Sequence, residues 1–473
     1  MGNPKAFLTI KRKEAGYRPV QDRILDFGEV EQTLNEEDRQ LQASRCMDCG
    51  VPFCHWSCPL GNKQPEWQNM VYKGRWKEAA ELLLETDDFP EFTGRICPAL
   101  CEKGCVLNKT KEPVTIRENE VAIIEKAFAE GYIVPFIPKK RTGKKVAVIG
   151  SGPAGMACAN QLNRKGHSVT IFEKDEYAGG LVRLGIPDFK LSKSIVERRV
   201  KLMEAEGVEF KYGANIGVTI PAAELLEEFD AVCVAIGSGV PRDLAKVEGR
   251  SLKGVHFALE YLQQQNRIVA GQKFEADELI NAKGKHVLVI GGGDTGSDCI
   301  GTANRQGAAK VTQIEIMPKP PVDDNPDTPW PYFPVVLKTS SSHKEGCDRF
   351  WSLDTERFIG EDGVVKEVEV TEVEWTKDAT GRMSLSKTNN HKIIKADLVF
   401  LAMGFVNPLY EGLLEQLGVE LSERKNVAID SKNQCSVAKV FAAGDAAMGA
   451  SLVVRAIASG RDAARSINKF LSE

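Results

Sequence analysis

Cysteines with close, regular spacing are the first residues in this 473-residue chain that could do chemistry. Seven of its twelve cysteines fall in one block near the N-terminus, arranged as C-x2-C-x4-C-x3-C and then C-x3-C-x3-C. In a reducing compartment, clustered cysteines suggest metal binding rather than disulfides. The seven are Cys46, Cys49, Cys54, Cys58, Cys97, Cys101 and Cys105.

The spacing bears on which metal these cysteines hold. Zinc favours four ligands, often as paired C-x2-C knuckles, and this block has only one C-x2-C. Iron–sulfur proteins use tight runs of thiolates with a proline after the last one, and Cys58 and Cys97 both precede proline. We expect iron–sulfur clusters, with zinc or disulfides as the alternatives. Seven thiolates and one other ligand would hold two 4Fe–4S clusters.

A glycine-rich turn after a short apolar stretch, Val146–Ile149, is the second feature with chemical meaning. A strand, Gly-x-Gly-x-x-Gly and a helix form the dinucleotide fingerprint: its glycines allow a tight turn, close approach to a pyrophosphate, and close helix packing. The helix N-terminus offers free N–H groups to the phosphates. A second strand, Ser168–Phe172, ends in an acid of the kind that usually holds a ribose. This predicted site comprises Gly150, Gly152, Pro153, Ala154, Gly155 and Glu173.

The same pattern occurs again later in the chain. A second apolar stretch, His286–Ile290, leads into another Gly-x-Gly-x-x-Gly turn and helix, and Val311–Met317 is its second strand. The sequence therefore predicts a second dinucleotide site, at Gly291, Gly293, Asp294, Thr295 and Gly296.

Further glycines and one aspartate complete the first predicted site. Glycines after residue 178 let the chain pass close to a bulky planar ligand. The apolar stretches 230–236 and 440–443 read as strands that end in glycine. An aspartate following such a glycine can hold a ribityl or ribose hydroxyl, and a helix over 452–470 lies behind it. These residues are Gly180, Gly237, Gly444 and Asp445.

Three structural domains are expected from these patterns. The fold class is α/β: two nested Rossmann-like dinucleotide-binding domains, preceded by a mainly α-helical iron–sulfur domain. We predict the iron–sulfur domain over 1–142, with helices over 38–45 and 64–85 and a linker over 132–144. The first dinucleotide-binding domain is predicted over 143–280 and 406–473, and the second over 281–405, inserted within it.

Composition narrows the function classes. The net charge is −4, from 62 basic and 66 acidic residues, which argues against a nucleic-acid partner. No apolar run approaches the length of a membrane span, and the N-terminus has no signal-peptide apolar core. We expect a cytoplasmic protein with no membrane partner.

The two fingerprints and the Gly444-Asp445 ending resemble the two-dinucleotide flavoprotein disulfide reductase superfamily over residues 145–473. The resemblance implies FAD at the first fingerprint and NADPH or NADH at the second. The redox-active C-x4-C that this superfamily carries beside the flavin is missing here, where Leu181-Val-Arg-Leu-Gly follows Gly180. Disulfide reduction is therefore not expected.

The cysteine block ahead of such a module resembles the glutamate synthase small (beta) subunit, and is similar to the electron-entry half of dihydropyrimidine dehydrogenase. The segments 314–321 and 339–343 look more like the former. The resemblance implies two crossed 4Fe–4S clusters. Cys46, Cys49, Cys54 and Cys105 would hold one; Cys58, Cys97 and Cys101 would hold the other, with Glu120 as the fourth ligand and Glu118 as the alternative.

The function that this resemblance implies is electron input. NAD(P)H would reduce FAD, and the clusters would pass electrons to a large (alpha) subunit that makes glutamate from 2-oxoglutarate and glutamine. That partner would supply the amidotransferase and FMN, so a hetero-oligomer is expected. No side-chain acid or base is required, and we name no catalytic residue. The alternatives are a free-standing NAD(P)H:ferredoxin-type oxidoreductase, the input subunit of another reductase, or a zinc-stapled nucleotide-sensing module.

The choice between NADH and NADPH depends on residues after the second strand. Glu315 stands where an acid would favour the free ribose of NADH, whereas Lys319 could meet a 2′-phosphate. The resemblance to bacterial small subunits favours NADPH.

Overall fold

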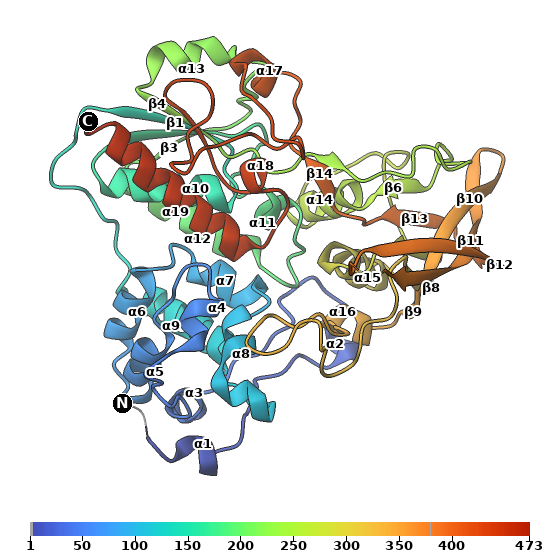
Figure 1. Ribbon diagram of the computed structural model, residues 1–473, viewed down its shortest axis with the longest axis horizontal. Helices are drawn as coiled ribbons and strands as arrows, with labels where there is room; N and C mark the ends of the chain where they lie inside the picture. Colours follow the sequence, from blue (N-terminus) through green and yellow to red (C-terminus); the bar gives the residue numbers. More distant parts are fainter. Residues whose placement is uncertain (1–2, 379) are drawn as a thin grey trace.

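The computed structural model describes residues 3–378 and 380–473. Figure 1 shows a helical N-terminal part in blue beneath two α/β units, with the C-terminal helix in red returning to the first of these units. The chain forms a helical N-terminal part and two α/β units. The α/β fold class with a helical N-terminal domain is confirmed.

Short helices make up the N-terminal domain. They pack around a core that includes Trp67, Val71 and Leu83, all fully buried. The predicted helix over 64–85 is divided in two, because Gly74 adopts a positive φ of 69°. The elements are α1 (Ala6–Thr9), α2 (Val20–Arg23), α3 (Glu36–Ser44), α4 (Phe53–Ser57), α5 (Gln64–Tyr72), α6 (Trp76–Leu84), α7 (Pro90–Ile96), α8 (Leu100–Gly104), the 3-10 helix η1 (Val106–Thr110) and α9 (Ile116–Ala129).

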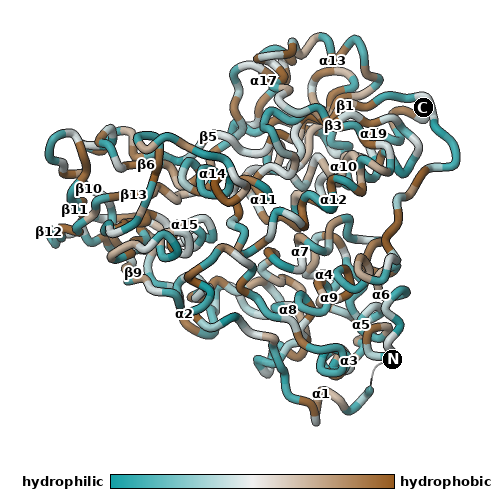
Figure 2. The backbone as a smooth tube through the Cα atoms, turned by 180° about the vertical axis from the view of Figure 1, so that it is seen from behind, coloured by the Kyte–Doolittle hydropathy of each residue, from teal (hydrophilic) through white to brown (hydrophobic). Residues whose placement is uncertain are grey.

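A five-stranded parallel sheet forms the first α/β unit, in the order β15-β4-β1-β2-β3. The strands of its centre are buried on both faces, as continuous apolar runs predict. Figure 2 marks apolar segments along the chain in brown. The strands are β1 (Lys145–Ile149), β2 (Ser168–Phe172), β3 (Glu209–Lys211), β4 (Ala231–Val234) and β15 (Val440–Ala442).

Helices cover both faces of this sheet. The fingerprint helix α10 (Pro153–Arg164) packs against the C-terminal helix α19 (Val453–Phe470), which therefore closes the unit that β1 begins. The other helices of this unit are α11 (Leu181–Leu184), α12 (Lys193–Ala205), α13 (Ala222–Glu228), α17 (Leu413–Leu417) and α18 (Asp445–Met448).

The second α/β unit contains a sheet in the order β6-β13-β7-β8-β9. Its first strand, β6, pairs with β13 in parallel register, Val255 opposite Val399. This sheet therefore includes residues before 281, the position at which we placed the domain boundary. The sequence pattern did not reveal β6, because so short a strand shows no clear periodicity. The elements are β6 (Val255–Phe257), α14 (Ala258–Val269), β7 (His286–Ile290), α15 (Asp294–Arg305), β8 (Lys310–Glu315), α16 (Ser341–Lys344), β9 (Asp348–Trp351) and β13 (Leu398–Leu401).

Two further sheets were not predicted. An antiparallel sheet of β10 (Leu353–Glu361), β11 (Val364–Lys377) and β12 (Met383–Lys395) extends from the second unit. Charged residues occupy much of it, and β12 is almost wholly exposed. Apolar and acidic residues do alternate in β11, where Val368 and Val370 are buried, but the sequence analysis missed this signal. The two connections between the units pair with each other as β5 (Val240–Pro241) and β14 (Phe405–Asn407).

A buried ion pair joins the N-terminal domain to the first α/β unit. Arg199 of α12 donates from Nε and Nη2 to the two carboxylate oxygens of Glu91 of α7, over 2.6 and 2.9 Å. Both side chains are almost completely buried. Nearby, Arg461 of α19 donates to Asp88 over 2.6 Å. Planar two-point pairing of this kind fixes orientation as well as distance.

Within the described residues, no helix is long and apolar enough to cross a membrane. The cytoplasmic location stays a prediction.

Removing one partner of the buried pair should destabilise the protein strongly. Glu91→Ala leaves the Arg199 guanidinium buried without its counter-charge, a change that typically costs about 3–5 kcal/mol. We expect a clearly lower thermal unfolding midpoint by circular dichroism. The matched control is Arg75→Ala, which removes the exposed Arg75–Glu78 pair. Equal midpoints for the two variants would contradict this role of the buried pair.

Candidate functional site

The first fingerprint is a turn that only glycine fits at two positions. Gly150 follows β1 with a φ of +100°, and a Cβ there would lie 2.5 Å from the carbonyl oxygen of Ala235. A Cβ on Gly155 would lie 2.0 Å from the carbonyl oxygen of Gly150. Gly152, in contrast, has no atom within 4 Å of its Cβ position. The turn is therefore closed towards the protein and open at Gly152, as a pyrophosphate cradle requires.

Other predicted residues converge on this turn. Gly152 is the N-cap of α10, with Pro153 and Ala154 as its first residues. A Cβ on Gly180 would lie 3.0 Å from the Cα of Gly152, and one on Gly444 would lie 2.6 Å from the Cβ of Ala154. Three distant chain segments thus meet at one helix N-terminus. This arrangement fits a nucleotide whose phosphates face α10.

Glu173 lies at the end of β2, directly beside the turn. Its Oε2 accepts hydrogen bonds from the backbone N–H of Ser151, over 3.0 Å, and from the Ser151 hydroxyl. Its Oε1 accepts from the N–H of Asp175 over 2.9 Å. Ser151 was missed from the sequence because its position in the fingerprint accepts any residue. These bonds hold the carboxylate next to the predicted ribose position.

The far end of the first site is built by β4 and α18. Burial raises the pKa of Asp445, whose Oδ1 accepts hydrogen bonds from the N–H and hydroxyl of Ser451 over 3.2 and 3.0 Å. The Ser238 hydroxyl donates to the Asp445 carbonyl over 3.3 Å. Gly237, with a φ of +71° and no atom near its Cβ position, precedes Ser238. Gly237 and Asp445 are therefore brought close together, as predicted.

The second fingerprint repeats the geometry of the first. Gly291 has a φ of +123°, and a Cβ there would lie 2.2 Å from the Ala402 carbonyl oxygen. A Cβ on Gly296 would lie 2.5 Å from the Gly291 carbonyl oxygen, while Gly293 faces open space. Gly293 is the N-cap of α15, and Asp294 and Thr295 begin that helix.

Two side chains brace the second turn, Gln313 buried and His343 half-buried. Gln313 Nε2 donates to the Gly291 carbonyl over 2.9 Å, and Gln313 Oε1 lies 3.0 Å from His343 Nε2. Burial lowers the pKa of His343 to about 4, so its ring is neutral at physiological pH. The sequence pattern marked neither Gln313 nor His343 as a site residue, because both act on the backbone from behind it.

Glu315 is directed at the second fingerprint. A Cβ on Gly292 would lie 2.0 Å from Glu315 Oε2, so the carboxylate rests against that backbone. Lys319 lies further out, with its Nζ 5.1 Å from the centre of the Trp351 ring. Of the two residues, Glu315 is the one in contact with the fingerprint turn.

The seven clustered cysteines line two separate hollows. Cys46, Cys49, Cys54 and Cys105 line the first hollow. Cys58, Cys97, Cys101 and Glu120 line the second. This division matches the crossed grouping implied by the family resemblance. Val454 of α19 also lines the second hollow, which therefore borders the first α/β unit.

Short helices hold these cysteines in place. Cys54 lies on α4 and Cys101 on α8, while Cys58, Cys97 and Cys105 are the residues that end α4, α7 and α8. Ends of short helices bring thiols from distant parts of the chain to one point. Among the described residues, no group of three or more His, Cys, Asp or Glu side chains is arranged to hold a single metal ion.

Burial dominates the acid–base behaviour of these thiols. It raises the pKa of Cys46, Cys58 and Cys97 to about 12 each, so the free thiols are protonated at neutral pH. Metal–thiolate bonding requires the deprotonated form. The positive charge of an iron core would compensate the negative charge of the thiolates. The donor set, seven thiols and one carboxyl group in two groups of four, fits two 4Fe–4S clusters.

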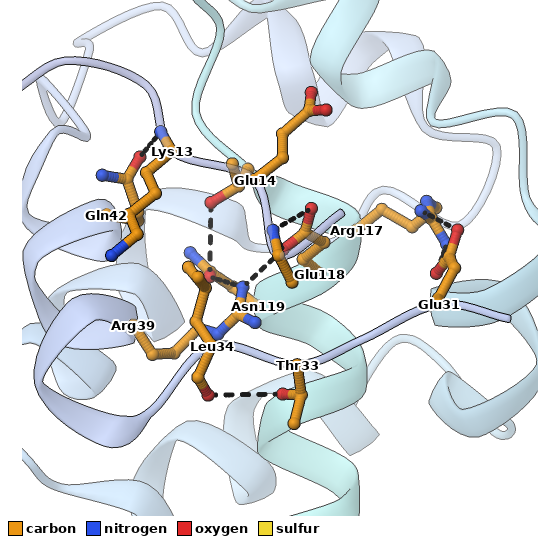
Figure 3. A network of polar contacts seen from close by, with 12 residues as sticks. Lys13, Glu14, Glu31, Thr33, Leu34, Arg39, Gln42, Arg117, Glu118 and Asn119 are labelled. Atoms are coloured by element: carbon orange, nitrogen blue, oxygen red, sulfur yellow. Dashed lines mark hydrogen bonds and ion pairs between the residues drawn. The ribbon is translucent and has the colours of Figure 1, made fainter. Parts of the chain in front are cut away.

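The structure distinguishes the two glutamates considered for the second hollow. Glu120 is buried against it; its Oε1 accepts from the Thr93 hydroxyl over 2.5 Å, and its Oε2 accepts from Asn62 Nδ2 over 3.3 Å. Glu118 precedes Glu120 by two residues on α9, and residues two apart on a helix point in nearly opposite directions. Arg39 donates to Glu118 over 3.1 Å (Figure 3). Glu118 is therefore occupied by an ion pair away from the hollow, which supports Glu120.

A loop of the second nucleotide unit lies against the first hollow. In Figure 1 this loop, between β8 and α16, runs beside α8. Trp330 donates from Nε1 to the Cys105 carbonyl over 3.3 Å, and its ring lies 4.8 Å from that of Phe53. Sequence reasoning missed this contact, because nothing in a proline-rich loop indicates what it packs against.

Family models match this organisation. Residues 144–460 match the model for pyridine nucleotide-disulphide oxidoreductases. Residues 23–132 match the model for dihydropyrimidine dehydrogenase domain II, 4Fe-4S cluster. The fold and site thus define a pyridine-nucleotide oxidoreductase with an N-terminal iron–sulfur domain.

Relatives narrow the family. The chain is 48% identical over its whole length to the glutamate synthase [NADPH] small chain of Mycobacterium tuberculosis, of which it covers 96%. It is 44% identical to the corresponding small chain of Bacillus subtilis, covering 99% of it, and 44% identical to 22% of the glutamate synthase [NADH] of Schizosaccharomyces pombe. The chain belongs to the glutamate synthase small-chain family and is an NAD(P)H-dependent oxidoreductase.

Solved structures share the nucleotide-binding fold. FprA of Mycobacterium tuberculosis in complex with NADPH aligns with a TM-score of 0.55 at 18% identity, over 70% of this chain and 84% of that one. Thioredoxin reductase of T. acidophilum aligns with a TM-score of 0.50 at 21% identity, over 70% of this chain and 100% of that one.

The fingerprint geometry predicts different outcomes for two glycines. In Gly152→Ala the added methyl group meets no protein atom, so the chain should fold normally. The methyl group would occupy the predicted pyrophosphate position, so the affinity for FAD should fall about tenfold, which corresponds to about 1.4 kcal/mol. Gly155→Ala places its Cβ against a carbonyl and should lower the thermal midpoint as well. Flavin released on denaturation and circular dichroism measure the two effects. If Gly152→Ala retained all of its flavin, the prediction that this turn binds the FAD pyrophosphate would be wrong.

Proposed function

We propose that this protein is the electron-input subunit of a glutamate synthase. It would oxidise a nicotinamide nucleotide at the second fingerprint and pass the electrons to a large (alpha) subunit. That subunit would carry the amidotransferase and FMN and make glutamate from 2-oxoglutarate and glutamine. The observation that carries the proposal is the pair of cysteine hollows beside a two-fingerprint module.

The assignment of cofactors follows the geometry of the chain. Gly150, Gly152, Glu173 and Asp445 are assigned to FAD, as the family resemblance implies; they bring three separate segments of the chain together. Gly291, Gly293 and Gly296 are assigned to the nicotinamide nucleotide. When bound, FAD accepts a hydride and releases single electrons, which two 4Fe–4S clusters carry.

The chain's own residues position and shield these groups. Gly152 and Gly293 expose helix N-termini, whose partial positive charge favours phosphates. Glu91 and Arg199 hold the cysteine domain against the flavin unit. Val454 reaches from the flavin unit to the second hollow, so no solvent layer separates these two parts at that point.

We further propose that the nucleotide is NADH. The names of the relatives include both NADPH and NADH forms. The carboxylate of Glu315 rests against the fingerprint, where it suits a free ribose diol and repels a 2′-phosphate. This placement favours NADH, against the preference for NADPH that the resemblance suggested.

Assembly distinguishes this function from a free-standing oxidoreductase. The chain should co-purify with a large chain of the glutamate synthase type when the two are co-expressed. Glutamate formation should require both chains, whereas NADH oxidation with an artificial acceptor should require only this one. A chain that stays monomeric and reduces a ferredoxin instead would overturn the proposal.

Nucleotide preference gives a direct prediction. We expect kcat/KM with an artificial acceptor to be higher for NADH than for NADPH, about tenfold or more for an interaction of about 1.4 kcal/mol. Glu315→Gln removes the charge and should narrow the ratio mainly by improving NADPH. The control Glu356→Gln removes a carboxylate from β10, away from the fingerprint. A parent protein that prefers NADPH would refute the role given to Glu315.

Ligand assignment gives a second prediction. Glu120→Ala removes the proposed fourth ligand and should cut iron from about eight to about four atoms per chain. Glu118→Ala is the matched control on the same helix and should retain about eight, because Glu118 pairs with Arg39. Mass spectrometry measures the iron content of both variants. A full iron content in Glu120→Ala would show that Glu120 is not a ligand.

A further inference from the structure

Gln64, the first residue of α5, lies between the two cysteine hollows. Its side chain lines the first hollow together with Cys46 and Cys54, and the second together with Cys58 and Cys101. Among the described residues, no other side chain lines both. Any group held in either hollow therefore has Gln64 as a neighbour.

The Gln64 amide is buried without a hydrogen-bond partner. The residue is 1% exposed, and neither Nε2 nor Oε1 makes a hydrogen bond within the described part of the chain. Buried polar groups are almost always paired, since an unpaired one loses its bonds to water without replacement. An unpaired amide of this kind, on a residue that lines both hollows, indicates a partner that occupies them.

Packing keeps the amide in this position. Trp67 and Val71 follow on α5 and are fully buried in the core of the N-terminal domain. The helix start is therefore anchored, and the Gln64 side chain is confined between the hollows. A glutamine amide carries two N–H groups, so it can donate in two directions.

We propose that the Gln64 amide donates hydrogen bonds to sulfur atoms of the clusters in both hollows and thereby raises the reduction potentials of both. Hydrogen bonds to cluster sulfur are one of the factors that set these potentials. A donor stabilises the more negative, reduced state, so its removal lowers the potential. The inference rests on the proposed occupancy of both hollows by 4Fe–4S clusters.

Gln68 offers an internal comparison. It lies one turn further along α5 and lines the first hollow only. Its Oε1 accepts from Asn119 Nδ2 over 2.7 Å, while its Nε2 is buried without a partner. Gln68 therefore acts on the first cluster alone, and Gln64 on both.

The test is a potentiometric titration of the full chain, followed by electron paramagnetic resonance. In Gln64→Leu, the ratio of reduced to oxidised cluster at a fixed potential should fall about tenfold for both clusters, a shift of about 59 mV for a one-electron couple. Gln68→Leu should shift one cluster only. Gln40→Leu, on α3 and outside both hollows, should shift neither.

Iron content separates the possible failures. A parent protein without about eight iron atoms per chain refutes the proposed function itself. Should Gln64→Leu lose iron, Gln64→Met keeps the length of the side chain without its N–H groups and repeats the test. Potentials equal to those of the parent, or a shift of one cluster only, in a variant that retains its iron overturn the role of Gln64.

Discussion

The gathering of seven thiols into two groups, where desolvation raises the pKa of each thiol, is the constraint on which the rest of the structure depends. The N-terminal domain consists of short helices whose surroundings favour the neutral form of its thiols, whereas a bound cationic core would favour the thiolates. Metal binding of this kind contributes directly to folding free energy. The domain is therefore expected to be stable only when both hollows hold their clusters.

The cysteine domain is held in a fixed position against both nucleotide units. The buried Glu91–Arg199 pair and the Asp88–Arg461 pair fix the cysteine domain against the unit that carries the first fingerprint. Trp330, in a loop of the second nucleotide unit, contacts Cys105 and Phe53, which line the first hollow. Each hollow is thus bordered by a different α/β unit, and all three parts share one arrangement rather than being strung on flexible linkers.

Sequence reasoning succeeded where backbone geometry dictates the residue. Gly150, Gly155, Gly291 and Gly296 are required by contacts that no side chain would fit, so their pattern is readable without a structure. It failed where contacts with residues distant in the sequence determine the structure or the role of a residue. β6 has three residues and is recognised only by its pairing with β13, and β12 is almost wholly exposed, so no buried face marks it as a strand. Gln64 is an ordinary helix residue in sequence, and only its position between two hollows distinguishes it.

The most direct test of this account is the cofactor content of the protein purified without oxygen. Absorption spectroscopy with iron, sulfide and flavin analysis should show a brown flavoprotein with about eight iron atoms, about eight sulfides and about one FAD per chain. NADH should bleach flavin and cluster absorption together. A colourless protein that holds zinc, or a flavoprotein without iron, would contradict the central claim.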